Sequence, residues 1–168
     1  MNRYKYERKE YTIGQIAFLA GIVEGEGSIY IGNFSCNPKT GSKYYQTNIE
    51  VTNTAKNLID WLYDTFGGRV YTYTAKQTPK NSRRTAYRWI ITGERVTHLS
   101  EIMLPYMIAK QRQTEIMIKM RETYKPVHGV RRGVQGIQIL EPELLALRQS
   151  YFEEMQSLHC RNYKNEKT

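Results

Sequence analysis

Apolar and polar residues follow one another along the chain with periods that change from that of a helix to that of a strand and back. The first apolar segment predicts a helix over about residues 13–24. Thr12 and Gln15 have the spacing of a capping box at its start, and Gly25 and Gly27 would end it. The chain therefore begins with a capped helix whose C-terminal end is rich in glycine.

Two segments with the period of two that is typical of strands follow, each divided by turn residues. The first hairpin is expected over about residues 28–36 and 44–51, with the turn at residues 37–41. The second is expected over about residues 69–77 and 84–92. One face of each hairpin would pack on the core. The inward-facing positions of the two most regular strands are Tyr45, Thr47, Ile49, Val51, Tyr87, Trp89 and Ile91.

Helices are expected between the hairpins and after them. One begins after Asn53 or Thr54, either of which could cap it, and ends at Gly67 and Gly68. A short helix is expected over about residues 94–103. The helix between the hairpins would connect two pairs of antiparallel strands and cover one face of their sheet.

The C-terminal third is expected to be mostly helical. A longer helix is predicted over about residues 109–124, followed by a glycine-containing and basic loop over residues 125–136. Pro142 lies where a first helical residue would be, so a final helix should begin there. The last residues, from Arg161 onward, are expected to be loose.

These elements predict an α+β fold with a four-stranded antiparallel sheet. The order is αββαββα with further C-terminal helices, so helices would cover one face of the sheet and polar side chains would line the other. We expect a single domain over residues 1–168, with a core over about residues 12–125 and a C-terminal extension over about residues 126–168.

Composition narrows the class of partner. Lysine and arginine number 25 against 16 aspartates and glutamates, and the formal net charge is +9. Such a charge favours a polyanion, nucleic acid first and an anionic membrane surface second. Neither a basic amphipathic helix for a membrane surface nor a membrane-spanning apolar run is present. Cys36 and Cys160 are far apart, which indicates neither a zinc site nor a disulfide framework, so an intracellular protein is expected.

The end of the first helix carries an electrostatic conflict. Glu24 and Glu26 lie where the helix dipole disfavours acidic side chains. A phosphate loop does not account for the glycines, because such loops run from strand to helix and here the helix comes first. Ala17, Gly21 and Gly25 form a stripe of small residues that would let another helix approach, but packing leaves the acids unexplained. A hard cation held by carboxylate and carbonyl oxygens would resolve the conflict.

The segment FLAGIVEGEGSI resembles the LAGLIDADG motif of the homing endonucleases, with glutamate in place of both aspartates. The segment MLPYMIAKQRQ is similar to the one that carries that family's active-site lysine. The resemblance covers about residues 12–125. It implies the αββαββα fold, with double-stranded DNA on the open face of the sheet.

The resemblance also implies a homodimer and a divalent metal site. The motif helices of two chains would pack together, and the interface residues carried over are Ala17, Ala20, Gly21, Glu24 and Gly25, with Glu24 in interface or capping contacts. Glu26, with the carbonyl of Gly25, would bind Mg²⁺. Mn²⁺ or Ca²⁺ could occupy the same site, and Ca²⁺ is expected to bind without supporting cleavage. The catalytic residues carried over are Glu26, Lys110 and Asn53, and an N-cap role remains the alternative for Asn53.

The polar face of the sheet supplies candidates for reading DNA sequence. Arginine suits guanine, asparagine and glutamine suit adenine, and glutamate can accept from cytosine. The candidates are Tyr30, Asn33, Tyr44, Gln46, Asn48, Glu50, Tyr71, Tyr73, Gln77, Arg84 and Arg88, with Arg112 as a phosphate contact.

Together these features predict a site-specific, Mg²⁺-dependent endonuclease for double-stranded DNA that promotes intron mobility. It would act as a homodimer on a long pseudo-palindromic site, with no small-molecule substrate and no membrane partner. The alternative is a relative without cleavage activity, an intron RNA maturase or a DNA-binding regulator. The sequence leaves open whether the compartment is an organelle, a bacterium or a phage-infected cell.

Overall fold

The computed structural model describes residues 6–37, 42–74, 85–124, 131–132, 138–139 and 142–164. The α+β class and the four-stranded antiparallel sheet are confirmed. A second, two-stranded sheet lies within and just after the segment predicted as a loop. The elements are α1 (Ile13–Glu26), β1 (Gly27–Asn37), β2 (Ser42–Asn53), α2 (Lys56–Phe66), β3 (Arg69–Thr74), β4 (Thr85–Thr92), α3 (Glu94–Met103), the 3₁₀ turn η1 (Leu104–Tyr106), α4 (Gln111–Glu122), β5 (Arg131–Arg132), β6 (Gln138–Ile139) and α5 (Pro142–Lys164).

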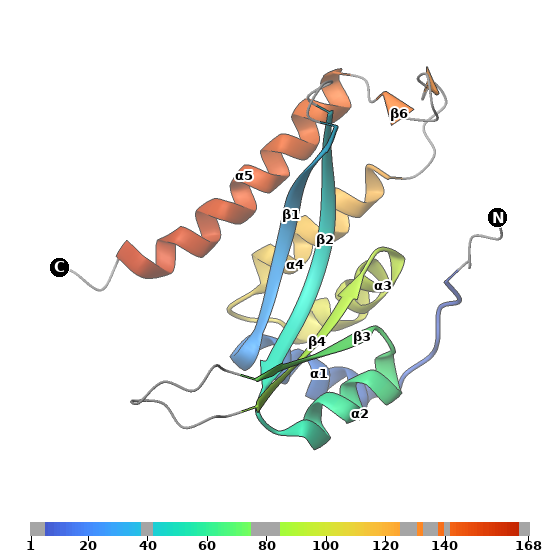
Figure 1. Ribbon diagram of the computed structural model, residues 1–168, viewed down its shortest axis with the longest axis vertical. Helices are drawn as coiled ribbons and strands as arrows, with labels where there is room; N and C mark the ends of the chain where they lie inside the picture. The colour runs from blue at the N-terminus through green and yellow to red at the C-terminus, as the bar shows by residue number, and fades with distance from the viewer. Residues whose placement is uncertain are drawn as a thin grey trace.

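The large sheet has the strand order β1-β2-β4-β3. Its β1–β2 hairpin follows the long axis of the molecule, with α1 and α2 at one end and α5 beside β1 (Figure 1). The alternation in β2 and β4 is as expected, because Tyr45, Ile49, Val51, Trp89 and Ile91 are all buried. The helices therefore cover one face of the sheet and leave the other open.

Helix α1 begins as its sequence predicts and ends later. The Thr12 hydroxyl accepts from the Gln15 N–H, and the Gln15 side chain accepts from the Thr12 N–H. The expected stop at Gly25 is wrong, because the helix continues through Glu26 before β1 begins at Gly27. A Cβ at Gly27 would lie 2.7 Å from the Val23 Cα, so only glycine allows the strand to leave the helix this closely.

Other boundaries differ by a few residues. Helix α2 has Ala55 as its N-cap rather than Asn53 or Thr54, although the Asn53 side chain accepts from the Ala55 N–H. Gly67, at φ 68°, ends α2 as predicted. Helix α4 begins after Lys110, two residues later than expected, because η1 takes up the preceding chain.

Helix α5 joins the C-terminal extension to the core and continues through Lys164. The expectation of loose chain is therefore wrong for residues 161–164, and residues 165–168 lie outside the described residues. Met155 is fully buried in the same hydrophobic cluster as the sheet and α1. Arg148 lies 4.0 Å from the ring centroid of Tyr124 and donates to the backbone carbonyl and the hydroxyl of Thr123. The Nε2 atom of His159 lies 3.0 Å from the Ile29 carbonyl oxygen, so α5 also covers part of the outer edge of β1.

Within the described ranges, none of the helices has the length and apolar content required to cross a membrane.

Candidate active site and nucleic-acid interface

Two of the predicted catalytic residues meet at the end of α1. Glu26 is the last residue of that helix and its side chain is exposed. The Nδ2 of Asn53, at the end of β2, donates to the Glu26 carboxylate. The other amide atom of Asn53, Oδ1, accepts from the Ala55 N–H at 2.8 Å. One side chain thus orients the carboxylate and supports the turn into α2.

Glu24 has a different environment from Glu26. Its Oε1 accepts from the backbone N–H groups of Ile108 at 3.1 Å and Lys110 at 2.9 Å, and its Oε2 accepts from Ala109 at 2.8 Å. These three donors precede α4, where unpaired N–H groups and the helix dipole favour an anion. The capping alternative for Glu24 agrees with this geometry. Its assignment to a dimer interface is not supported, because its carboxylate is used within its own chain.

Lys110 makes the reciprocal contact at the end of α1. Its Nζ donates to the carbonyl oxygens of Val23 and Glu24, both at 2.8 Å, and of Gly27 at 2.7 Å. An ammonium has three N–H donors, so these three acceptors match its full capacity. Burial lowers the pKa of Lys110, and the charge of Glu24 opposes that shift.

The two contacts together resolve the conflict at the acidic helix end. A lysine charge lies at the C-terminus of α1 and a glutamate charge lies at the N-terminus of α4, and each is the sign that the helix dipole favours. The ammonium of Lys110 could contact a phosphate only by giving up one of its carbonyl partners. These contacts give Lys110 a structural role in holding the α1 terminus that carries Glu26, and the catalytic role that the resemblance implies for it stays a prediction.

Lys110→Met is expected to lower the free energy of unfolding by about 2–3 kcal/mol, because three carbonyl groups lose a charged donor. Urea denaturation followed by circular dichroism measures this. Lys119→Met is the matched control, since Lys119 is an exposed lysine on the same helix. Equal midpoints for the two variants would contradict the structural role of Lys110.

Glu24→Gln is expected to make folding less sensitive to acid. Burial tends to raise the pKa of Glu24, but the three N–H donors and Lys110 lower it below its ordinary value of 4.5. The folded state then favours the carboxylate, so this stabilisation is complete above about pH 4.5 and is lost as the pH falls through the lower folded pKa. Urea midpoints between about pH 6 and pH 3 should fall less steeply in the variant than in the unchanged protein. Parallel curves would contradict the assignment.

The stripe of small residues on α1 is open to approach by another helix. Ala17, Gly21 and Gly25 are exposed, and a Cβ added at either glycine would meet no atom within 4 Å. Phe18, which is 53% exposed and packs on Trp61, adds an apolar side chain beside the stripe that sequence reasoning missed. Ala20 is a correction, because it is 1% exposed and belongs to the core of its own chain.

The open face of the sheet carries most of the predicted DNA-reading residues. Directly paired residues share a face in an antiparallel sheet, and the observed pairs include Tyr30 with Asn48 and Tyr71 with Arg88. The predicted residues on this face are Tyr30, Tyr44, Gln46, Asn48, Glu50, Tyr71, Tyr73 and Arg88. Strand parity also places Ser28, Phe34, Thr52 and Arg69 there, which selection by residue type had missed.

Two of the predicted base-reading residues need correction. Asn33 pairs with Tyr45 and therefore lies on the helix side of the sheet, so its placement on the DNA face is wrong. Asn48 is on the open face but is 3% exposed, and its side chain donates to the Gln46 carbonyl at 2.9 Å. Gln77 and Arg84 lie outside the described residues.

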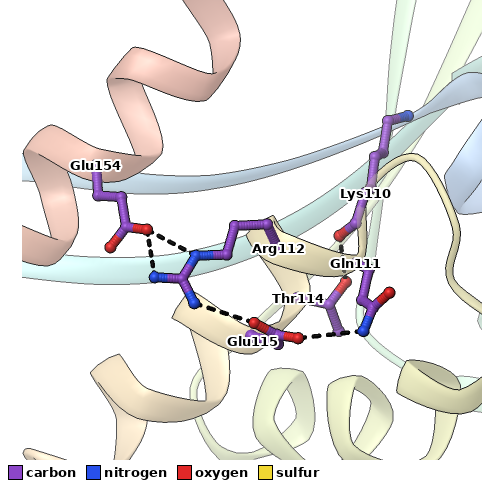
Figure 2. A network of polar contacts seen from close by, with 6 residues as sticks. All are labelled: Lys110, Gln111, Arg112, Thr114, Glu115 and Glu154. Atoms are coloured by element: carbon purple, nitrogen blue, oxygen red, sulfur yellow. Dashed lines mark hydrogen bonds and ion pairs between the residues drawn. The ribbon is translucent and has the colours of Figure 1, made fainter.

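Arg112 is engaged by acidic side chains instead of projecting freely towards a phosphate. Its guanidinium forms ion pairs with Glu154 of α5 at 2.5 Å and with Glu115 of α4 at 3.1 Å. Figure 2 shows Arg112 between these two carboxylates, while the Lys110 side chain points in another direction. We therefore remove Arg112 from the candidate DNA contacts and assign it to the packing of α5 on α4.

Among the described residues, no group of three or more histidine, cysteine, aspartate or glutamate side chains is placed to hold a metal ion. Within those residues Glu26 therefore belongs to no such cluster. The predicted Gly25 carbonyl ligand stays a prediction, and a divalent cation there would need further oxygen ligands.

The chain has the fold of the LAGLIDADG homing endonucleases, as comparison with solved structures shows. It matches the homing endonuclease I-CvuI, solved with a DNA target in the presence of Mg, with a TM-score of 0.62 and 15% identity over 86% of this chain and 81% of that one. It also matches the archaeal intron-encoded homing endonuclease I-Vdi141I, complexed with DNA, with a TM-score of 0.64 and 15% identity over 86% and 84% of the two chains.

A third match shows how one such unit can form part of a longer chain. It is the LAGLIDADG homing endonuclease I-SmaMI bound to cleaved DNA, with a TM-score of 0.59 and 15% identity over 90% of this chain and 47% of that one. Neither models of protein families nor curated protein sequences match the chain. The resemblance that the motif suggests is thus confirmed for the fold.

Proposed function

We propose that this protein is a site-specific endonuclease that cleaves both strands of DNA as a homodimer with Mg²⁺. The observation that carries the proposal is the position of Glu26. This carboxylate is exposed, oriented by Asn53, and placed at the end of a helix with an open stripe of small residues. The basic net charge of +9 and the open polar face of the sheet support DNA as the partner.

The donor chemistry of the site fits a hard divalent cation. Glu26 would hold Mg²⁺, with oxygen atoms from a second chain and from the DNA completing the ligand set. The bound cation would supply positive charge beside the scissile phosphate, and Mn²⁺ could replace Mg²⁺. The chain's own residues would fix the site: Asn53 orients the Glu26 carboxylate, and Lys110 holds the carbonyl groups around the end of α1.

A second copy of the chain would complete the active site. Each chain contributes one Glu26, and two-fold packing of α1 through Ala17, Gly21 and Gly25 would bring the two carboxylates towards a common axis. The exposed Phe18 lies beside this stripe and would be covered in such a dimer. Cleavage of both strands follows, because the two-fold axis relates one active site to each strand.

The sheet sets the length of the proposed target. Strands β1 and β2 have 11 and 12 residues. At about 3.3 Å per residue they span about 36–40 Å, which matches about ten or eleven base pairs of one half-site. The full target would be a pseudo-palindrome of about twenty base pairs. In an intron-encoded enzyme it would lie in the uninterrupted host gene.

The decisive experiment is cleavage of a plasmid that carries the uninterrupted host gene. Purified protein with Mg²⁺ is expected to convert supercoiled plasmid to the linear form, and protein with Ca²⁺ is expected to bind without cutting. Binding without linearisation in either Mg²⁺ or Mn²⁺ would favour a DNA-binding regulator. Preferential binding to the intron transcript would favour a maturase.

A further inference from the structure

Four strands contribute to one cluster of side chains on the open face of the sheet. Arg88 of β4 lies with its guanidinium carbon 5.3 Å from the ring centroid of Tyr71 and 4.8 Å from that of Tyr73, both on β3. Its Nη1 is 3.8 Å from the Oε2 of Glu50 on β2. The same Oε2 accepts from the hydroxyl of Tyr30 on β1 at 3.1 Å.

Glu50 and the two tyrosines together restrict the orientation of the Arg88 guanidinium. The side chain of Arg88 is 33% exposed, and its Nε is buried and has no hydrogen-bond partner in the part of the chain that the structure describes. The Glu50 side chain is 21% exposed, so the arginine is the more accessible member of the pair. Aromatic contacts on one side and a carboxylate on another leave the terminal guanidinium few orientations.

We propose that Arg88 reads a guanine in each half-site and that Glu50 is a positioning residue for Arg88 instead of a reader of cytosine. This proposal rests on the proposed DNA-binding function and deepens it. It revises the earlier expectation for Glu50, which residue type alone had favoured as an acceptor for the cytosine amino group.

The chemistry of the cluster accounts for both roles. An arginine donates through two parallel N–H groups to the O6 and N7 atoms of guanine, and this geometry needs a fixed guanidinium plane. Glu50 already accepts from Tyr30 and faces Arg88, so it would have to leave both to reach a base. Holding the arginine before binding also reduces the conformational entropy lost in the complex.

The Tyr30 hydroxyl donates a hydrogen bond to the Glu50 carboxylate and keeps its proton at neutral pH. Burial and the neighbouring Glu50 raise the pKa of Tyr30 to about 12, so its hydroxyl stays protonated at neutral pH. Glu50 thus keeps this hydrogen bond at Oε2, the same oxygen that faces Arg88. Tyr30 on β1 therefore holds Glu50, and Glu50 in turn faces Arg88.

The test is selection of binding sites from a double-stranded DNA library with about 24 randomised base pairs, in Ca²⁺ to retain uncut complexes. The unchanged protein is expected to select a guanine at one symmetric position of each half-site. Arg88→Ala should lose about 5- to 150-fold of the discrimination at that base pair. Glu50→Gln should lose part of the discrimination at the same pair, and Tyr30→Phe a smaller part.

A double-mutant cycle separates positioning from direct reading. If Glu50 acts through Arg88, the double variant Arg88→Ala with Glu50→Gln loses no more discrimination than Arg88→Ala alone. Gln46→Ala is the control on the same face and should change a different base pair, additively with Arg88→Ala. Circular dichroism confirms that each variant is folded, and Tyr30→Phe provides an independent route if Glu50→Gln does not fold.

The outcomes that overturn the positioning role differ from the one that overturns the proposed function. Additive losses for Glu50→Gln and Arg88→Ala, or unchanged discrimination in both Glu50→Gln and Tyr30→Phe, would overturn the positioning role while leaving the DNA-binding function intact. Selection of no sequence at all by the unchanged protein would overturn the proposed function itself.

Discussion

Glu26→Gln is expected to abolish cleavage of both DNA strands while leaving DNA affinity close to that of the unchanged protein. The substitution keeps the size of the side chain and removes the charge that would hold Mg²⁺. Loss of a metal that stabilises the reacting phosphate costs several kcal/mol, so the rate should fall by about a thousandfold or more. Gel shift in Ca²⁺ measures binding, and single-turnover cutting in Mg²⁺ measures the rate.

Glu10→Gln is the matched control, because Glu10 is an exposed glutamate that precedes α1. It should cut and bind as the unchanged protein does. Efficient cutting by Glu26→Gln would contradict the assignment of Glu26 to the active site. Equal loss of binding and cutting would place Glu26 in the DNA interface instead.

Gly21→Leu is expected to split the homodimer and to abolish double-strand cleavage, with no cost to the fold of the single chain. The new side chain would meet no atom of its own chain at Cβ, and leucine favours a helix by almost 1 kcal/mol over glycine. In the proposed dimer the same side chain would keep the two α1 helices apart. The thermal midpoint of a monomeric sample should therefore stay the same or rise.

Sedimentation equilibrium at micromolar concentration measures the assembly, and the 19.8 kDa chain mass makes monomer and dimer easy to separate. Gln156→Leu is the control, because it adds an exposed leucine to the other long helix, α5. It should remain dimeric and active. A Gly21→Leu protein that is dimeric and cuts normally would exclude α1 as the contact, and an unchanged protein that cuts both strands as a monomer would refute the dimer.

Structural features that depend on residues close together in the sequence can be predicted from the sequence. The Thr12 and Gln15 pair specifies the start of α1, because both partners of the capping box lie within one turn. The period of two in β2 predicts which of its side chains are buried, and Gly67 at positive φ ends α2. The family resemblance, not a local pattern, carries over Glu26 and Asn53 as members of one site, and the structure brings their side chains into contact.

Contacts between side chains that are distant in the sequence cannot be predicted from a local pattern. Arg112 looks like a free cation in its own segment, but α5 brings Glu154 to it across 42 positions. Residue type favours Asn33 as a base-reading side chain, whereas the pairing of β1 with β2 turns it towards the helices. In both cases the surroundings come from another element.

The sequence by itself determined the fold class, the order of the main elements, the burial pattern of the inner strands and the acidic end of α1. Only the tertiary structure decided what neutralises that end, namely the reciprocal contacts of Glu24 and Lys110 across 86 positions. Helix caps and strand alternation arise from interactions within a few residues and therefore leave a local pattern. The partner of a charge depends on which helix termini pack together, and that is set by burial of the whole core.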